Sequence, residues 1–142
     1  MYISKSMATE FDIVFTRLKE ILQKYSGSFN VKPDTNTKYG LYAKVGPATL
    51  KVWGGNPSTS LRMKKPAMPV AWVETGKAYV SYHLMGMYGN KKLHESMSKE
   101  LMARMQGKSC FNFKKIDEKI FAELDELTAK SIDAFRKAGF IL

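Results

Sequence analysis

The sequence predicts an α+β domain in which an antiparallel sheet of about five strands is packed by N- and C-terminal helices. Near each terminus, apolar residues recur every three or four positions, which is the period of an amphipathic helix. Between these segments, short β-branched and aromatic runs are separated by glycine-containing turns, which is typical of hairpins. Because hairpin strands pair antiparallel, two hairpins plus one further strand favour an α+β class over a doubly wound one.

Length and composition place the chain among globular proteins. The 142 residues are most simply one domain over 1–142, long enough to bury a core without staples. No apolar run approaches the roughly 20 residues of a membrane-spanning helix, and the N-terminus has no signal-peptide pattern. The single cysteine, Cys110, excludes an internal disulfide framework. We therefore expect a soluble protein of a reducing cytoplasm.

The first element is a helix predicted over 9–26. Thr9 and Asp12 have the spacing of a capping box, and Gly27 supplies a stop. Its apolar face consists of Phe11, Val14, Phe15, Leu18, Leu22 and Tyr25. The polar segment 28–38 that follows is expected to be an exposed connector.

Two hairpins come next. Residues 39–45 and 48–53 alternate on either side of Gly46-Pro47 and predict the first hairpin. Residues 54–68 then form a basic loop, and the sequence does not tell whether this loop is ordered. Residues 69–84 predict the central hairpin, turning at Thr75-Gly76, where glycine is expected to adopt a positive φ.

Successive side chains of the second central strand point to opposite faces of the sheet. The two sets are Tyr79, Ser81 and His83 on one face, and Val80, Tyr82 and Leu84 on the other. We expect the second set to face the helices. Tyr79 and His83 are then the two that face away from them.

The C-terminal half is predicted as helix, strand and helix. Residues 91–106 are expected to break into two short helices, with Ser98 capping the second. A strand over 109–113 precedes the last helix, over 117–138, capped by Asp117 and stopped by Gly139. The residues predicted to be buried together are Phe15, Leu18, Leu22, Val80, Leu124, Leu127 and Phe135.

Three short runs carry a resemblance to a known family. Residues 70–73 (Val-Ala-Trp-Val), 77–82 (Lys-Ala-Tyr-Val-Ser-Tyr) and 107–113 (Gly-Lys-Ser-Cys-Phe-Asn-Phe), followed by a long closing helix, resemble the YdhG-like domains. These are small bacterial proteins, largely of unknown function, and the match covers about 39–138. The resemblance implies a frataxin-like shape and, as one alternative, iron chaperoning. Iron favours clustered carboxylates, but Glu10, Asp12 and Glu20 lie among basic residues, so this alternative ranks last.

Charge and aromatic residues point to a ligand. The net charge is +10, and no acidic residue lies between Asp34 and Glu74, which favours anionic partners. Aromatic residues of the central hairpin beside the basic loop are able to stack a planar or anionic ligand. The candidate contacts are Trp72, Tyr79, Tyr82, His83, Lys64 and Lys65. The ordinary interpretation, that most of these aromatics belong to the core, is favoured.

No convincing catalytic set, metal site or cofactor motif is present. Cys110 and His83 would form a thiol–imidazole pair if their strands are neighbours, but a buried small cysteine is the default. His83, Met85 and Met87 suit a soft metal ion, yet methionines ordinarily fill gaps in a core. The favoured function is a non-enzymatic domain that binds a small anionic ligand or a protein. The alternative is a nucleic-acid or polyanion binder.

Overall fold

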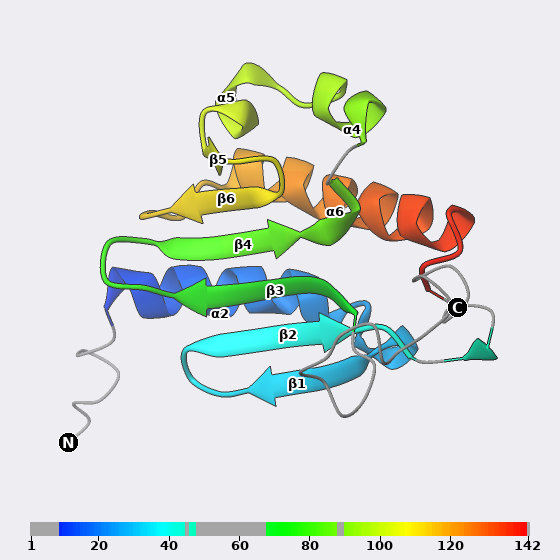
Figure 1. Ribbon diagram of the computed structural model, residues 1–142. Helices are drawn as coiled ribbons and strands as arrows, with labels where there is room; N and C mark the ends of the chain where they lie inside the picture. The colour runs from blue at the N-terminus through cyan, green and yellow to red at the C-terminus, as the bar shows by residue number, and fades with distance from the viewer. Residues whose placement is uncertain (1–8, 45, 48–67, 88–89, 142) are drawn as a thin grey trace.

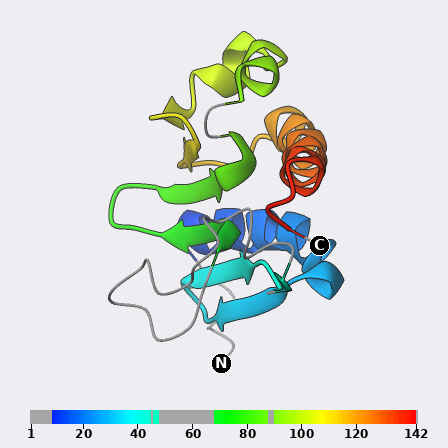
Figure 2. The same ribbon diagram turned by 45° about the vertical axis from the view of Figure 1, so that its right-hand side comes forward.

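An antiparallel sheet backed by two long helices forms the frame of the protein. The computed structural model describes residues 9–44, 46–47, 68–87 and 90–141. Its strands run in the order β1-β2-β3-β4-β6-β5, and α2 and α6 lie behind them (Figure 1 and Figure 2). The strands are β1 (Asn30–Asp34), β2 (Lys38–Tyr42), β3 (Pro69–Thr75), β4 (Val80–Leu84), β5 (Met105–Gln106) and β6 (Cys110–Phe113). The helices are α2 (Glu10–Gln23), α4 (Lys91–Glu95), α5 (Lys99–Met102) and α6 (Glu118–Lys137), with 3-10 turns η1 (Ser26–Ser28) and η3 (Met85–Met87).

Helix α2 begins with the predicted capping box. The Thr9 amide donates to Asp12 Oδ2 at 2.9 Å, and the Asp12 amide donates to Thr9 Oγ1 at 3.1 Å. Two of the amides that have no partner inside the helix are thereby satisfied. The helix ends at Gln23, earlier than predicted, because the chain tightens into η1. Gly27 therefore lies within this 3-10 turn and is not the residue that stops the helix.

The segment predicted as an exposed connector contains β1, so that prediction is wrong. β1 pairs with β2, with Val31 opposite Leu41, and β2 pairs with β3 along its other edge. The expected pairing of 39–45 with 48–53 is thus replaced by β1 with β2, and residues 48–67 lie outside the described part. Pro33 and its polar neighbours concealed β1, but an edge strand tolerates proline because its outward amides need no partner.

The central hairpin is confirmed. β3 and β4 pair antiparallel, with Trp72 opposite His83 and Val73 opposite Tyr82. The turn lies further along the chain than predicted, because β3 extends to Thr75, which pairs with Val80, and the Gly76 amide donates to the Tyr79 carbonyl at 2.9 Å. Among the described glycines, positive φ occurs at Gly107 and Gly139 and not at Gly76. Gly76 to Tyr79 connect the paired residues Thr75 and Val80, and loops of this length are most often built around a type I turn, which needs no positive φ at its central residues.

The C-terminal elements follow the prediction, with one additional strand. Ser98 caps α5 by accepting from the Leu101 amide at 3.1 Å, and Asp117 caps α6 by accepting from the Ile120 amide at 3.2 Å. Before Gly107 the chain forms β5, which was predicted to be helix, so the sheet has six strands and not five. Its pairing with β6 turns at Gly107, whose φ is 77°.

The core lies between the sheet and the two long helices. Phe15, Leu18, Leu22, Val80, Leu124 and Leu127 belong to one buried cluster, as predicted. Phe135 is only partly buried, although it packs against the same cluster. No helix among the described residues is long and apolar enough to cross a membrane.

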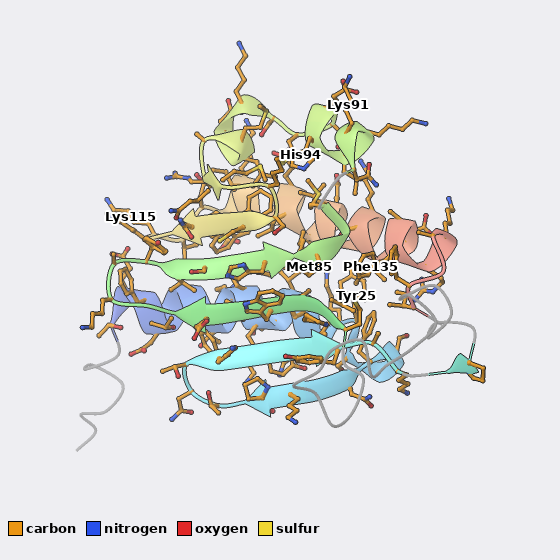
Figure 3. The ribbon with its side chains drawn as sticks, viewed as in Figure 1. Tyr25, Met85, Lys91, His94, Lys115 and Phe135 are labelled. Carbon is orange, nitrogen blue, oxygen red and sulfur yellow. The ribbon has the colours of Figure 1, made fainter. Side chains whose placement is uncertain are left out.

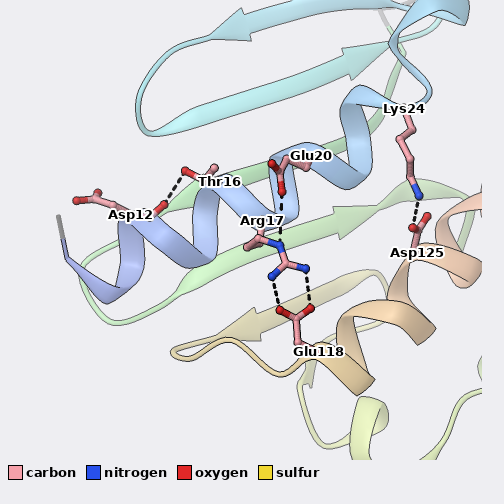
Figure 4. Close-up of polar contacts among 7 residues, drawn as sticks. All are labelled: Asp12, Thr16, Arg17, Glu20, Lys24, Glu118 and Asp125. Atoms are coloured by element: carbon pink, nitrogen blue, oxygen red, sulfur yellow. Dashed lines mark hydrogen bonds and ion pairs between the residues drawn. The ribbon is translucent and has the colours of Figure 1, made fainter. Parts of the chain in front are cut away.

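Two ion pairs join the helices on the outer side of this layer. Arg17 forms a bidentate ion pair with Glu118, in which Arg17 Nη2 donates to Glu118 Oε1 at 2.6 Å (Figure 4). Lys24 pairs with Asp125 further along the two helices (Figure 4). Because α2 and α6 both pack behind the sheet, its other face carries no helix from the described residues (Figure 1). We call this second surface the open face.

Candidate ligand-binding site

A row of residues crosses the open face from strand to strand. The register places Gly40, Trp72, His83, Cys110 and Gln106 opposite one another on β2, β3, β4, β6 and β5. The row begins at a glycine because a Cβ on Gly40 would lie 2.6 Å from a carbonyl oxygen of β1. It then presents side chains of very different chemistry within a few strand spacings, each about 4.8 Å.

Trp72 and His83 form a stacked pair in this row. Their ring centroids are 4.4 Å apart and the ring planes differ by 13°. Burial lowers the pKa of His83 below its ordinary value, with Glu74 opposing the shift and Lys38 adding to it. The imidazole is therefore neutral at pH 7. Both rings are half-buried, so the pair is held in place and still reaches the surface.

Cys110 lies beside His83, as the sequence suggested for neighbouring strands. Its Sγ is 3.7 Å from His83 Nε2 and 3.5 Å from Asn112 Oδ1. Burial raises the pKa of the Cys110 thiol. A nucleophilic cysteine needs the opposite shift, because the thiolate is the reactive form. The pair is thus a neutral thiol next to a neutral imidazole, and it belongs to the polar surface of the row.

A chain of hydrogen bonds continues from Cys110 to the edge of the sheet. Asn112 Nδ2 donates to Gln106 Oε1 at 2.7 Å, and the Tyr79 hydroxyl donates to the same oxygen at 3.2 Å. Tyr79 precedes β4 and Asn112 lies in β6, so residues far apart in sequence meet here. The stacked pair and the sheet edge are therefore joined by one continuous polar path.

That path ends at a cleft of about 520 Å³, which we call the basic cleft. Because Val80 pairs with Phe113, Tyr79, which precedes β4, and Lys114, which follows β6, lie at the same end of these two strands. The lining residues are Tyr79, Arg104, Asn112, Lys114, Lys115, Ile116 and Asp117. Within the described part of the chain, the cationic groups of Arg104, Lys114 and Lys115 form no ion pair. The one carboxylate, that of Asp117, accepts the Ile120 amide at the start of α6.

The six residues predicted to contact a ligand are divided by the structure. Trp72 and His83 stack on the open face, and Tyr79 lines the basic cleft. Tyr82 is fully buried on the helix side, where its hydroxyl lies 2.6 Å from Thr128 Oγ1. It therefore shares no surface with the other three. Lys64 and Lys65 lie outside the described residues.

Sequence reasoning missed the cations of the basic cleft. Arg104, Lys114 and Lys115 flank β5 and β6, outside the acid-free stretch before Glu74 from which the sequence predicts an anionic ligand. The available signal was the pair Lys114-Lys115 directly after a strand that neighbours β4. Antiparallel pairing of β4 with β6 places that pair beside Tyr79, but this pairing is not deducible from spacing alone.

Several of the residues considered for metal binding lie apart from one another or have other partners. In the part of the chain that the structure describes, no three His, Cys, Asp or Glu side chains lie together. Met87 is fully buried in the core, whereas His83 belongs to the open face. Asp12 caps α2, and Glu20 Oε1 lies 3.4 Å from Arg17 Nε.

No family model, no curated protein and no solved structure matches this chain. The resemblance to the YdhG-like domains stays a prediction. The candidate site therefore depends on the geometry of the open face and of the basic cleft.

Proposed function

We propose that the protein is a cytoplasmic, non-enzymatic binding domain whose ligand carries a phosphate or a similar anionic group, held in the basic cleft. The observation that carries this proposal is the convergence of Arg104, Lys114 and Lys115 on one cleft without an ion pair among the described residues. Three cations around one cleft raise the local concentration of anions, and a bound anion reduces the repulsion among them.

The chemistry of the lining fits a phosphate. The planar guanidinium of Arg104 is able to donate two parallel hydrogen bonds to phosphate oxygens, and the lysine ammonium groups act as point charges. Tyr79 and Asn112 add neutral groups that hydrogen-bond the rest of a ligand. Asp117 opposes an anion, but its carboxylate is turned to the Ile120 amide of α6.

The chemistry beside the cleft supports binding over catalysis. Cys110 and His83 are neutral together, so they do not supply a thiolate and a cationic acid. The second candidate function is a binder of extended polyanions, which the net charge of +10 favours.

The test is a titration followed by amide chemical shifts, with inorganic phosphate and with adenosine monophosphate. We expect shifts at Tyr79, Arg104 and Lys114, and at least a tenfold weaker affinity in the double variant Lys114→Gln/Lys115→Gln. A hydrogen bond to a charged group contributes roughly 1.5 kcal/mol or more, and its loss corresponds to at least a tenfold change in affinity.

The matched control is Lys91→Gln/Lys92→Gln, which removes the same charge from α4. Lys91 and Lys115 lie at well-separated places on the molecule (Figure 3). Equal losses in the two double variants would mean that only the net charge matters, and the proposed site would be wrong. An absence of shifts around the cleft would reject the site as well.

A further inference from the structure

We propose that the ligand is single-stranded nucleic acid, with its phosphates in the basic cleft and a base stacked on the Trp72–His83 pair of the open face. This inference rests on the proposed function, because the cleft supplies the phosphate contacts. It adds a second point of contact and a chemical class of ligand. The inference is based on one observation: the basic cleft and the Trp72–His83 stack lie at the two ends of the same polar path.

The stacked pair is suited to a base. A ring that is already held against a second ring loses little conformational freedom when a ligand stacks on it. Trp72 and His83 are half-buried on the open face, so part of their ring system reaches the surface. Stacking on aromatic side chains tolerates every base, because each base has a π-face.

The groups between the stack and the cleft are suited to sugars and base edges. His83, Cys110, Asn112, Gln106 and Tyr79 are all neutral, and they form a connected set of donors and acceptors. Neutral groups of this kind hydrogen-bond a nucleotide without adding charge repulsion.

One acidic residue, Glu74, lies near this path on the open face. Glu74 lies in the next row of the open face, opposite Lys38 in the register. Opposite charges at facing positions of neighbouring strands attract each other. Lys38 therefore offsets part of the repulsion between Glu74 and a bound phosphate.

The length of the path decides between a nucleotide and a strand. Tyr79 precedes His83 by four residues, which corresponds to about 13 Å along β4. One nucleotide, with a single sugar between base and phosphate, does not span that distance. A short strand does, and only unpaired bases are free to stack on a flat protein face. We therefore expect a strand of several nucleotides to bind more tightly than a mononucleotide.

The test measures binding of a short oligothymidylate. Trp53 is the other tryptophan of the chain, so Trp53→Phe leaves Trp72 as the single tryptophan, whose fluorescence is excited selectively over that of tyrosine. We expect the strand to quench Trp72 fluorescence. Trp72→Ala should weaken oligothymidylate binding about 5- to 150-fold, which corresponds to one stacked base, and Trp72→Phe should restore part of the loss.

Two controls separate the alternatives. Heparin carries negative charge without bases, so Trp72→Ala should leave heparin affinity unchanged. The slope of log affinity for oligothymidylate against log salt concentration should become about 1.4 less steep in Lys114→Gln/Lys115→Gln. This value assumes two lost phosphate contacts at about 0.7 each on a single strand. Equal effects of Trp72→Ala on both polymers would overturn the inference, and so would unchanged Trp72 fluorescence.

The outcomes also separate this inference from the proposed function. If phosphate binds the cleft and adenosine monophosphate binds as tightly as the strand, the inference fails and the proposed function stands. If phosphate causes no change in the chemical shifts of the cleft residues, the proposed function and the inference both fail. Should Trp72→Ala not fold, quenching of Trp72 in the Trp53→Phe protein and the affinity of Trp72→Phe decide the question.

Discussion

The two faces of the sheet are formed by the same strands but differ in how deeply their side chains are buried. On β4, Val80, Tyr82 and Leu84 are fully buried against the helices, while the intervening Ser81 and His83 are half-buried on the open face. The alternation follows from the two-residue period of a strand. The chain therefore places a packed layer and an accessible polar layer one residue apart.

Two neighbouring aromatic residues show what this difference means. Tyr82 lies opposite Val73, and its hydroxyl contacts Thr128 Oγ1, which in turn donates to the Leu124 carbonyl. Trp72, one position from Val73, stacks on His83 on the other side. The polar atom of Tyr82 is satisfied inside the core, whereas Trp72 is half-buried on the open face. The face, and not the type of side chain, decides between these roles.

The largest expected effect tests the packed face. Leu124 is 0% exposed, and Leu124→Ala removes its contacts and leaves a cavity, so we expect about 2–5 kcal/mol less stability. The matched change on the open face, Ser81→Ala, should stay within about 0.5 kcal/mol. Urea unfolding of both variants measures the difference. Equal costs would remove the distinction between the faces.

Gly86 gives the next largest effect, where the sheet end meets α6. A Cβ at this position would lie 2.3 Å from Ser131 Oγ and 2.4 Å from the Ser131 carbonyl oxygen. One of those contacts is backbone, so Gly86→Ala forces α6 to shift, at a cost of about 1–3 kcal/mol.

Gly27 is the matched control for this second variant. Nothing lies within 4 Å of a Cβ built on Gly27, so Gly27→Ala should change the free energy of unfolding by less than about 0.5 kcal/mol. Thermal unfolding of the two variants compares them directly. If Gly86→Ala proved as mild as Gly27→Ala, the close approach of η3 to α6 would be wrong.

The packed face was largely predictable from the sequence because its signals are local. The helix period predicted four buried residues of α2, namely Val14, Phe15, Leu18 and Leu22, and Thr9 with Asp12 predicted its cap. Ile21 is buried as well, whereas Phe11 and Tyr25 of the predicted face are only partly buried. The alternation of 80–84 predicted which side of β4 would be buried. Each of these depends on residues within one turn or one strand, where periodicity and capping chemistry act.

The open face and the basic cleft were predictable only in part, because they depend on which strands are neighbours. Tyr79 and His83 were placed on the correct side, since that follows from alternation alone. The meeting of Tyr79 with Lys114 and Lys115 follows from the pairing of β4 with β6. β1 was missed because Pro33 and polar neighbours resemble a turn, and an edge strand has no second partner to impose a strand pattern.

The smallest predicted effect concerns the pH dependence of stability, which should reveal His83 on the open face. Burial lowers the His83 pKa, so the folded protein binds this proton less readily than the unfolded chain, whose histidine titrates near pH 6.5. As the pH falls below about 6.5, the unfolded chain takes up the proton before the folded protein does. The free energy of unfolding therefore declines until the pH has passed below the folded-state pKa of His83. Above about pH 7.5 both states hold a neutral ring, and this contribution to the pH dependence vanishes.

His83→Gln removes the titrating group, so its urea midpoint should fall less than that of the unmodified protein between about pH 7.5 and pH 5. The comparison cancels the carboxylates, which both proteins share. The effect is expected to be modest, because the ring still reaches solvent and Glu74 favours its charged form. An identical decline in both proteins would mean that His83 is as well solvated as in the unfolded chain. The Trp72–His83 stack would then be more open than its 4.4 Å geometry implies.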